Sequence, residues 1–201
     1  MPHQQYQQTQ TNSCGASSLL CASMELGSTR LPQVANWPLW MLGADLDTNQ
    51  TSEMAIYSVT SGEQGRPPGP DAGYSLPSYI FEAAQAMGRV AVAYVPYSLV
   101  GTMLTTLYAS DLRRAQGMGM TVHRTEAPAP TANTRLLRVV RVGSNSMFQP
   151  ALGLHYILQR PDGSVMDPAL GIDTNGLASL SRFQDSQGAA YVDTGIGIMI
   201  Y

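Results

Sequence analysis

The stretch "LHYILQRPDGSVMDPALG", residues 154–171, predicts two short strands joined by a tight turn. Apolar runs lie on both sides of a Pro-Asp-Gly sequence at 161–163, which suits a three-residue hairpin loop. In that loop Gly163 takes the left-handed conformation and forms a bulge. We therefore expect an antiparallel hairpin here.

The register of this hairpin brings a histidine and an aspartate together. The three-residue loop pairs Arg160 with Ser164, so Ile157 lies opposite Asp167. Because side chains alternate along a strand, His155 shares a face with Asp167, as a diagonal neighbour about 7–8 Å away at Cα. We expect the carboxylate to accept Nδ1–H of the imidazole and to leave Nε2 free to act on a thiol. A two-residue loop would put the carboxylate on the opposite face.

A cysteine stands at the start of the first predicted helix. Residues 4–27 read "QQYQQTQTNSCGASSLLCASMELG", in which apolar residues recur at helical spacing over 14–26 and a glycine follows as a stop. Asn12 or Ser13 is a suitable N-cap, which places Cys14 in the first turn. Such a cysteine is either a small core residue or a nucleophile.

The nucleophile interpretation has a physical basis. The positive end of a helix dipole favours a thiolate at Cys14, and an imidazolium at His155 would lower the thiol pKa further. Such an ion pair attacks a carbonyl carbon, and the histidine later protonates the leaving amine. The oxyanion needs donors, for which the main-chain N–H of Cys14 and the side-chain amide of Gln8 are candidates.

The two cysteines are predicted to be free thiols. On one helix Cys14 and Cys21 would lie about 10 Å apart at about 1.5 Å per residue. A disulfide needs a Cα separation of roughly 4.4–6.8 Å. With no CxxC pair and no cluster, the sequence gives no zinc signal, and we expect neither a metal nor an organic cofactor.

Predicted helices dominate the first part of the chain and predicted strands the last. The helices include one over Leu99–Gln116, and the strands follow from about residue 118. This order predicts an α+β fold in which an N-terminal helical lobe packs on a C-terminal antiparallel β-sheet. We expect a single domain over 1–201, with the helical lobe at about 1–117 and the β-rich lobe at about 118–201.

Composition narrows the function classes. A net charge of −3 with no basic run argues against a nucleic-acid partner, and no apolar stretch reaches the roughly 20 residues of a membrane span. The N-terminus lacks the pattern of a signal peptide. We therefore expect a protein of the bacterial cytoplasm, or one that a specialised system secretes into a host cell. The chain has no lysine, which reflects either a GC-rich genome or a benefit of offering no ubiquitin acceptor in a host.

The order of these residues resembles a known family. Gln8 lies six positions before "SCGASSL", and "GLHYIL" and "MDP" follow much later, as in papain-like cysteine peptidases. The likeness is greatest to the bacterial branch that cleaves double-glycine leaders from bacteriocins. It implies a papain-like fold with Cys14 as nucleophile, His155 as base, Asp167 as orienting residue and Gln8 as oxyanion donor.

The predicted function is hydrolysis of a peptide amide through a Cys-His-Asp triad and a thioester intermediate, on a peptide or protein substrate. The protein could be a secreted bacterial effector. Two alternatives remain open. The same fold could act on side-chain amides as a glutamine deamidase or transglutaminase, or it could be a catalytically idle binding module. The oligomeric state is not predicted.

Overall fold

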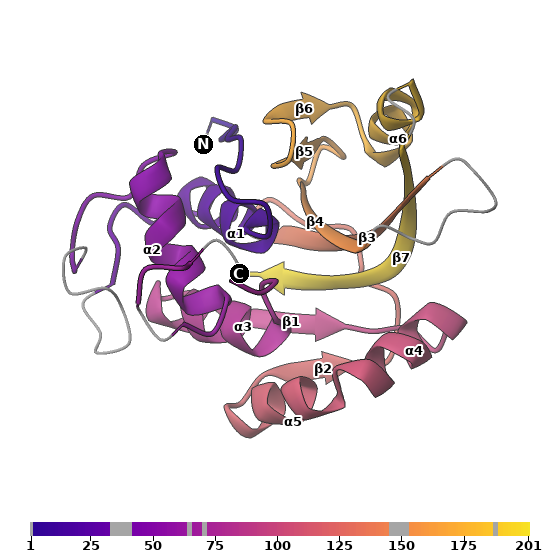
Figure 1. Cartoon of the computed structure of the whole chain (residues 1–201), viewed down its shortest axis with the longest axis horizontal. Helices are drawn as coiled ribbons and strands as arrows, with labels where there is room; N and C mark the ends of the chain where they lie inside the picture. The colour runs from indigo at the N-terminus through magenta and orange to yellow at the C-terminus, as the bar shows by residue number, and fades with distance from the viewer. Residues whose placement is uncertain (1, 33–41, 64–65, 70–71, 145–152, 187–188) are drawn as a thin grey trace.

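The computed structural model describes residues 2–32, 42–63, 66–69, 72–144, 153–186 and 189–201 (Figure 1). The helices are α1 (Cys14–Glu25), α2 (Gln50–Thr60), α3 (Pro77–Ala86), α4 (Leu99–Leu107), α5 (Ala109–Gly117) and α6 (Leu177–Ser186). The strands are β1 (Ala91–Tyr94), β2 (Thr121–His123), β3 (Arg135–Ser144), β4 (Gly153–Gln159), β5 (Val165–Asp167), β6 (Ile172–Thr174) and β7 (Ala189–Ile200).

All seven strands join one sheet in the order β2-β1-β7-β3-β4-β5-β6. Every neighbouring pair is antiparallel except β1 and β2, which are parallel. The predicted α+β fold, with N-terminal helices packed on an antiparallel sheet, is confirmed, and the sheet is mixed because the β1–β2 pair at its edge is parallel. Helices α4 and α5 connect β1 to β2, and a connection of that length returns the chain to the end of the sheet where β1 began.

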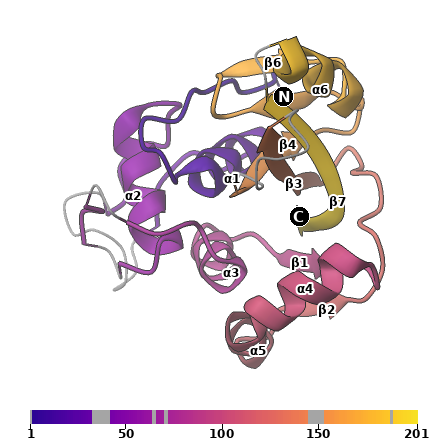
Figure 2. The same ribbon diagram turned by 45° about the vertical axis from the view of Figure 1, so that its right-hand side comes forward.

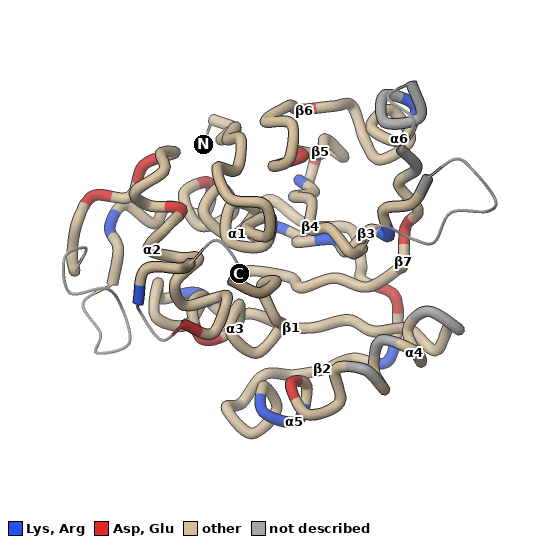
Figure 3. Tube along the Cα trace, in the orientation of Figure 1, with Lys and Arg blue, Asp and Glu red and all other residues tan. Residues whose placement is uncertain are grey.

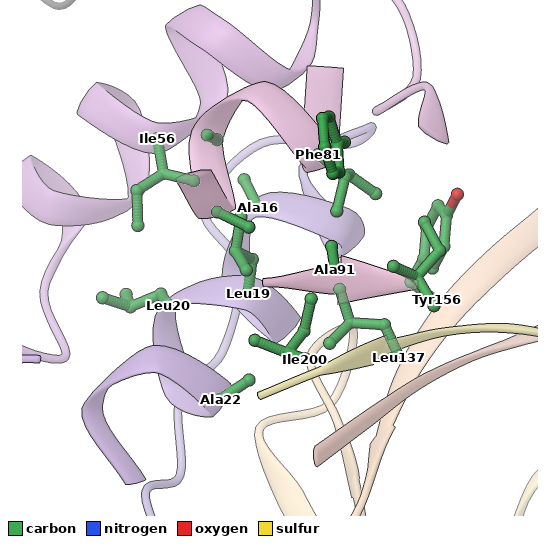
Figure 4. Close-up of a cluster of buried hydrophobic side chains, with 14 of the residues drawn as sticks. Ala16, Leu19, Leu20, Ala22, Ile56, Phe81, Ala91, Leu137, Tyr156 and Ile200 are labelled. Carbon is green, nitrogen blue, oxygen red and sulfur yellow. The ribbon is translucent and has the colours of Figure 1, made fainter. Parts of the chain in front are cut away.

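Helices α1, α2 and α3 form a layer on one face of the sheet (Figures 1 and 2). Helix α1 lies between α2 and the strands β3 and β4, so it is covered on both sides. Leu19 and Leu20 are wholly buried, and truncating such a side chain to alanine costs about 2–5 kcal/mol. The core they join is drawn in Figure 4, where the labelled residues are Ala16, Leu19, Leu20, Ala22, Ile56, Phe81, Ala91, Leu137, Tyr156 and Ile200.

Helix α6 covers part of the second face. Val140 of β3 and Ile157 of β4 cluster with Val165 of β5 and Leu180 of α6. Since side chains alternate across a strand, these residues lie on the other side of the sheet from α1. The strands around the predicted histidine are therefore packed on both faces.

The helix predicted over Leu99–Gln116 is divided in two. Tyr108, with φ −107° and ψ 25°, leaves helical geometry between α4 and α5. Helix α4 contacts β7, whereas α5 contacts α3. The break lets each half pack on its own partner, which a local apolar pattern does not specify.

Among the described residues, the Arg, Asp and Glu positions are scattered along the chain, as Figure 3 shows. In the part of the chain that the structure describes, no helix has both the length and the apolar character needed to cross a membrane. Nor do the described His, Cys, Asp and Glu side chains form a group of three that could hold a metal ion.

Candidate active site

The β4–β5 hairpin forms as predicted. The main-chain N–H of Arg160 donates to the carbonyl of Ser164 at 3.0 Å, and the N–H of Gly163 donates back to the carbonyl of Arg160 at 3.0 Å. Gly163 has φ +84°, and Leu158 pairs with Met166. The predicted register is therefore confirmed, and local turn chemistry accounts for it.

The hairpin brings His155 and Asp167 into contact. Nε2 of His155 lies 2.7 Å from Oδ1 of Asp167, and the two side chains are 9% and 0% exposed. The expectation that Nδ1 would face the carboxylate is wrong. Cys14 lies against the β4 main chain, where the N–H of Tyr156 donates to its sulfur at 3.5 Å. The ring nitrogen nearer the main chain is thus left for the thiol, and the farther one meets the carboxylate.

Cys14 occupies the first position of α1 and is 4% exposed. Burial raises the pKa of its thiol, but the charge and hydrogen bond of His155 lower it, and so do the N–H groups of Tyr156 and Gly15; the net direction is down. Burial lowers the pKa of His155, but the Cys14 thiolate and the Asp167 carboxylate outweigh it and raise that pKa to about 10. The geometry favours a thiolate–imidazolium pair.

The second cysteine is in a different environment. Cys14 and Cys21 are both free, as predicted, and both are buried. Burial and the nearby charge of Glu25 raise the pKa of the Cys21 thiol. Because a thiolate is the reactive form, Cys21 is expected to be inert.

Tyr191 on β7 completes the surroundings of the carboxylate. Its hydroxyl donates to Oδ2 of Asp167 at 3.1 Å, and its ring centroid lies 5.6 Å from that of His155. The N–H of Ala169 donates to Oδ1 at 2.9 Å. Burial raises the pKa of Asp167, but these donors together with His155 lower it overall. No sequence motif marks Tyr191, because its strand pairs with β3, far from the hairpin in the chain.

Replacing Tyr191 with phenylalanine should lower kcat about three- to tenfold and leave KM nearly unchanged, since one hydrogen bond to the carboxylate is worth about 1 kcal/mol. The ring stays in place, so folding is preserved. Tyr97→Phe, at a tyrosine that is 79% exposed, serves as the matched control. Equal kcat values for the two variants would contradict a positioning role for the Tyr191 hydroxyl.

Gln8 lies beside the Asp-Pro turn. Its main-chain N–H donates to the carbonyl of Pro168 at 2.8 Å. The side-chain Nε2 donates to the carbonyls of Gln10 at 2.7 Å and Thr11 at 3.0 Å. Both N–H bonds of the amide thus point to the loop before Cys14, so donation to an oxyanion requires the amide to give one of them up.

The start of α1 carries no side-chain cap. Ser13 is the N-cap residue, but its hydroxyl donates to Oε1 of Glu53 at 2.5 Å, and Asn12 donates instead to the carbonyl of Ala72. The prediction of the cap position is confirmed for Ser13, whereas its capping hydrogen bond is absent. Position 15 requires a glycine for steric reasons, because a Cβ there would lie 2.5 Å from the Cβ of Ser75.

A cavity of about 500 Å³ reaches the thiol. Its walls come from the segment before α3, from α4 and α5, and from β3 and β4. They are mostly apolar, and the lining residues include Cys14, Leu76, Val95, Met103, Leu112, Val139, Leu154, Tyr156 and Ile196. Arg141 stands on the same lining. The thiol therefore lies at the boundary of an apolar binding space.

Comparison with known proteins is consistent with this geometry. Residues 6–201 match the family described as "Invasion plasmid antigen J, cysteine protease". "Cysteine protease IpaJ" of Shigella flexneri is 33% identical over 198 residues, which cover 94% of this chain and 74% of that protein. The chain belongs to the IpaJ cysteine protease family. No solved structure matches it.

Membership of the IpaJ family confirms the predicted class of enzyme, a cysteine protease, and with it a protein substrate. The relation to papain-like peptidases, and to the double-glycine leader peptidases in particular, stays a prediction. So do the roles of Cys14, His155, Asp167 and Gln8.

Proposed function

We propose that this IpaJ-family protease hydrolyses a peptide amide through a papain-like triad of Cys14, His155 and Asp167. The observation that carries the proposal is the contact of His155 Nε2 with Asp167 Oδ1 at 2.7 Å, beside a buried Cys14 thiol whose pKa the charge of His155 lowers against the effect of burial. The sulfur stands at the start of a buried helix, where the dipole favours negative charge.

In the proposed reaction the Cys14 thiolate attacks the scissile carbonyl, and a C–S bond forms as the carbonyl oxygen becomes an oxyanion. The oxyanion collapses, the C–N bond breaks, and the imidazolium of His155 gives its proton to the leaving amine. Water then attacks the thioester while His155 takes its proton, which releases the acid and restores the thiol pair. Asp167 holds the ring by Nε2 throughout.

The proposed oxyanion donors are the main-chain N–H of Cys14 and the amide of Gln8. The uncapped first turn of α1 supports the first of these, because no side chain occupies its N–H groups. The position of Gln8 in the loop leading to Cys14 supports the second. Substrate binding would have to replace one of its carbonyl partners.

The apolar cavity supports a substrate with an apolar group beside the scissile bond. Burying such a group contributes about 25 cal/mol per Å² and fixes the carbonyl near the sulfur. We also propose that both lobes act as one catalytic domain, since β1 of the helical half and the β-rich half share the sheet.

The name of the relative and the lysine-free composition support a setting in which the protein acts as a bacterial effector inside a host cell. A reporter-tagged chain expressed in a bacterium with a contact-dependent secretion system should then reach the cytosol of host cells. Retention of the reporter in the bacterium would contradict this setting but would leave the proposed catalytic triad unaffected.

The test of the triad is covalent trapping. An epoxysuccinyl thiol-protease inhibitor should label the folded protein once, on Cys14, and mass mapping should find Cys21 unmodified. Denatured protein treated with iodoacetamide provides the control in which both thiols react. Inhibitor label on Cys21 would contradict the proposal. The absence of label on folded protein would also contradict it, provided that both thiols react with iodoacetamide after denaturation.

A further inference from the structure

Glu53 of α2 is fully buried and binds the segment that leads to Cys14. Its two oxygens accept the main-chain N–H of Thr9 at 2.9 and 3.0 Å, and Oε2 accepts the Thr9 hydroxyl at 2.6 Å. The hydroxyls of Tyr6 and Ser13 donate to it at 2.7 and 2.5 Å. All of these donors are neutral, and no ion pair of the described residues includes Glu53.

A buried carboxylate without a cation is costly, so this set of donors must stabilise it. All the donors belong to one stretch, residues 6–13, which has neither helix nor strand and ends at the nucleophile. Glu53 therefore fixes the path of the chain into the active site.

Ser13 connects the hydrogen bonds of Glu53 to helix α1, because it is the N-cap residue of that helix. A capping serine usually has extended backbone, and its oxygen accepts an N–H of the first turn. Here Ser13 has φ −91° and ψ 11°, and its hydroxyl lies 2.5 Å from Oε1 of Glu53 and 2.8 Å from the carbonyl oxygen of Gln10.

From this arrangement, and resting on the proposed function, we infer that Glu53 is a positioning residue of the active site. It holds residues 6–13 and keeps the Ser13 hydroxyl away from the first turn of α1. The N–H groups of that turn thus remain available to the thiolate and to the oxyanion. Glu53 itself does not touch the substrate.

A glutamine at position 53 cannot replace the carboxylate. Thr9 directs one N–H at both oxygens, and an amide NH₂ in either place would face a donor. Ser13 would keep the carbonyl of Gln10 as an acceptor but lose the carboxylate that holds its hydroxyl, which is then freer to cap α1. Loss of a negative charge near the thiol has the opposite electrostatic effect, because it favours the thiolate. A lower thiol reactivity in Glu53→Gln would therefore indicate capping by Ser13, and a higher one would indicate the loss of the negative charge.

The experiment measures the rate of Cys14 alkylation by iodoacetamide at about pH 6, where a free thiol of pKa about 8.5 is almost unreactive. We expect Glu53→Gln to react about tenfold more slowly than the native protein, a change within the range of helix-terminus effects. Adding Ser13→Ala to this variant removes the capping hydroxyl and should restore at least about threefold of the rate. Glu82→Gln on α3 is the matched control and should react at the native rate. Mass spectrometry assigns the label, and circular dichroism confirms that each variant is folded.

An alkylation rate in Glu53→Gln equal to or above the native rate would overturn the inference. So would a variant with both Glu53→Gln and Ser13→Ala that reacts as slowly as Glu53→Gln alone. If Glu53→Gln does not fold, Glu53→Asp keeps the charge but shortens the reach to Ser13; it should also slow alkylation, and a native rate in that variant would overturn the inference. A native protein that fails to alkylate at this pH would contradict the triad instead, so the two failures are distinct.

Discussion

Replacing Cys14 with alanine should reduce proteolysis by a factor of about 10⁴–10⁶, the range seen when a covalent nucleophile is removed. The second thiol cannot take over, since Cys21 is wholly buried two helical turns away and its pKa is raised. Substrate binding should survive, because the walls of the cavity are intact. The measurement is kcat on a cleaved substrate, with Cys21→Ala as the control that retains activity.

His155→Ala should be almost as severe, and the double variant with Cys14→Ala should be no worse than either single one, because the two groups act as a unit. The pH dependence of the reaction follows from the directions of the two pKa shifts. In the native protein the reactive pair exists between the lowered pKa of Cys14 and the pKa of about 10 at His155. Alkylation at about pH 6 should therefore be faster than that of a free thiol, and activity should fall as pH rises through the His155 value.

Without His155 the burial of Cys14 is no longer opposed by a positive charge, so the pKa of its thiol rises relative to that in the native protein. Alkylation of His155→Ala at about pH 6 should then be at least about a hundredfold slower than in the native protein. An unchanged rate in this variant would show that the imidazole does not activate the thiol.

Replacing Glu25 with glutamine should cost about 3–5 kcal/mol of unfolding free energy, because it leaves the buried Arg135 without its carboxylate and Arg160 with only the partly exposed Asp173. Glu25 ends α1 and is wholly buried at its side chain. Its oxygens accept Nε of Arg135 at 2.5 Å, Nε of Arg160 at 2.7 Å and the N–H of Gln4 at 2.9 Å. Arg160 also donates to Asp173 at 2.8 Å.

This network joins α1, the start of β3 and the end of β4, and it clamps the N-terminal segment through Gln4. Urea unfolding measures the loss, and Glu82→Gln again serves as the control. Glu82 pairs with Arg114, whose side chain is 40% exposed, and such a pair is worth at most about 1 kcal/mol. A loss below about 1 kcal/mol in Glu25→Gln would show that the buried arginines find other partners.

Some features of the site follow from local sequence. The Pro-Asp-Gly loop sets the register that places His155 with Asp167, since a turn's backbone geometry depends on its own residues. The pattern of α1 and the following glycine place Cys14 at a helix start, because helical spacing is also a local property. The α+β class follows from the order of such elements along the chain.

Other features depend on partners that are distant in the chain. Which nitrogen of His155 faces the thiol depends on how closely α1 approaches β4, and the hydroxyl of Tyr191 reaches Asp167 only because β7 pairs with β3. The break at Tyr108 and the parallel β1–β2 pair depend on packing in the same way.

The sequence by itself thus determined the hairpin, the cysteine-bearing helix and the order of the candidate triad, since each depends on backbone preferences over a few residues. Only the tertiary structure decided the ring nitrogen, the Tyr191 and Glu53 contacts, the buried Glu25 network and the apolar cavity. These need side chains from separate elements to meet at hydrogen-bond distance, and no local pattern encodes that distance.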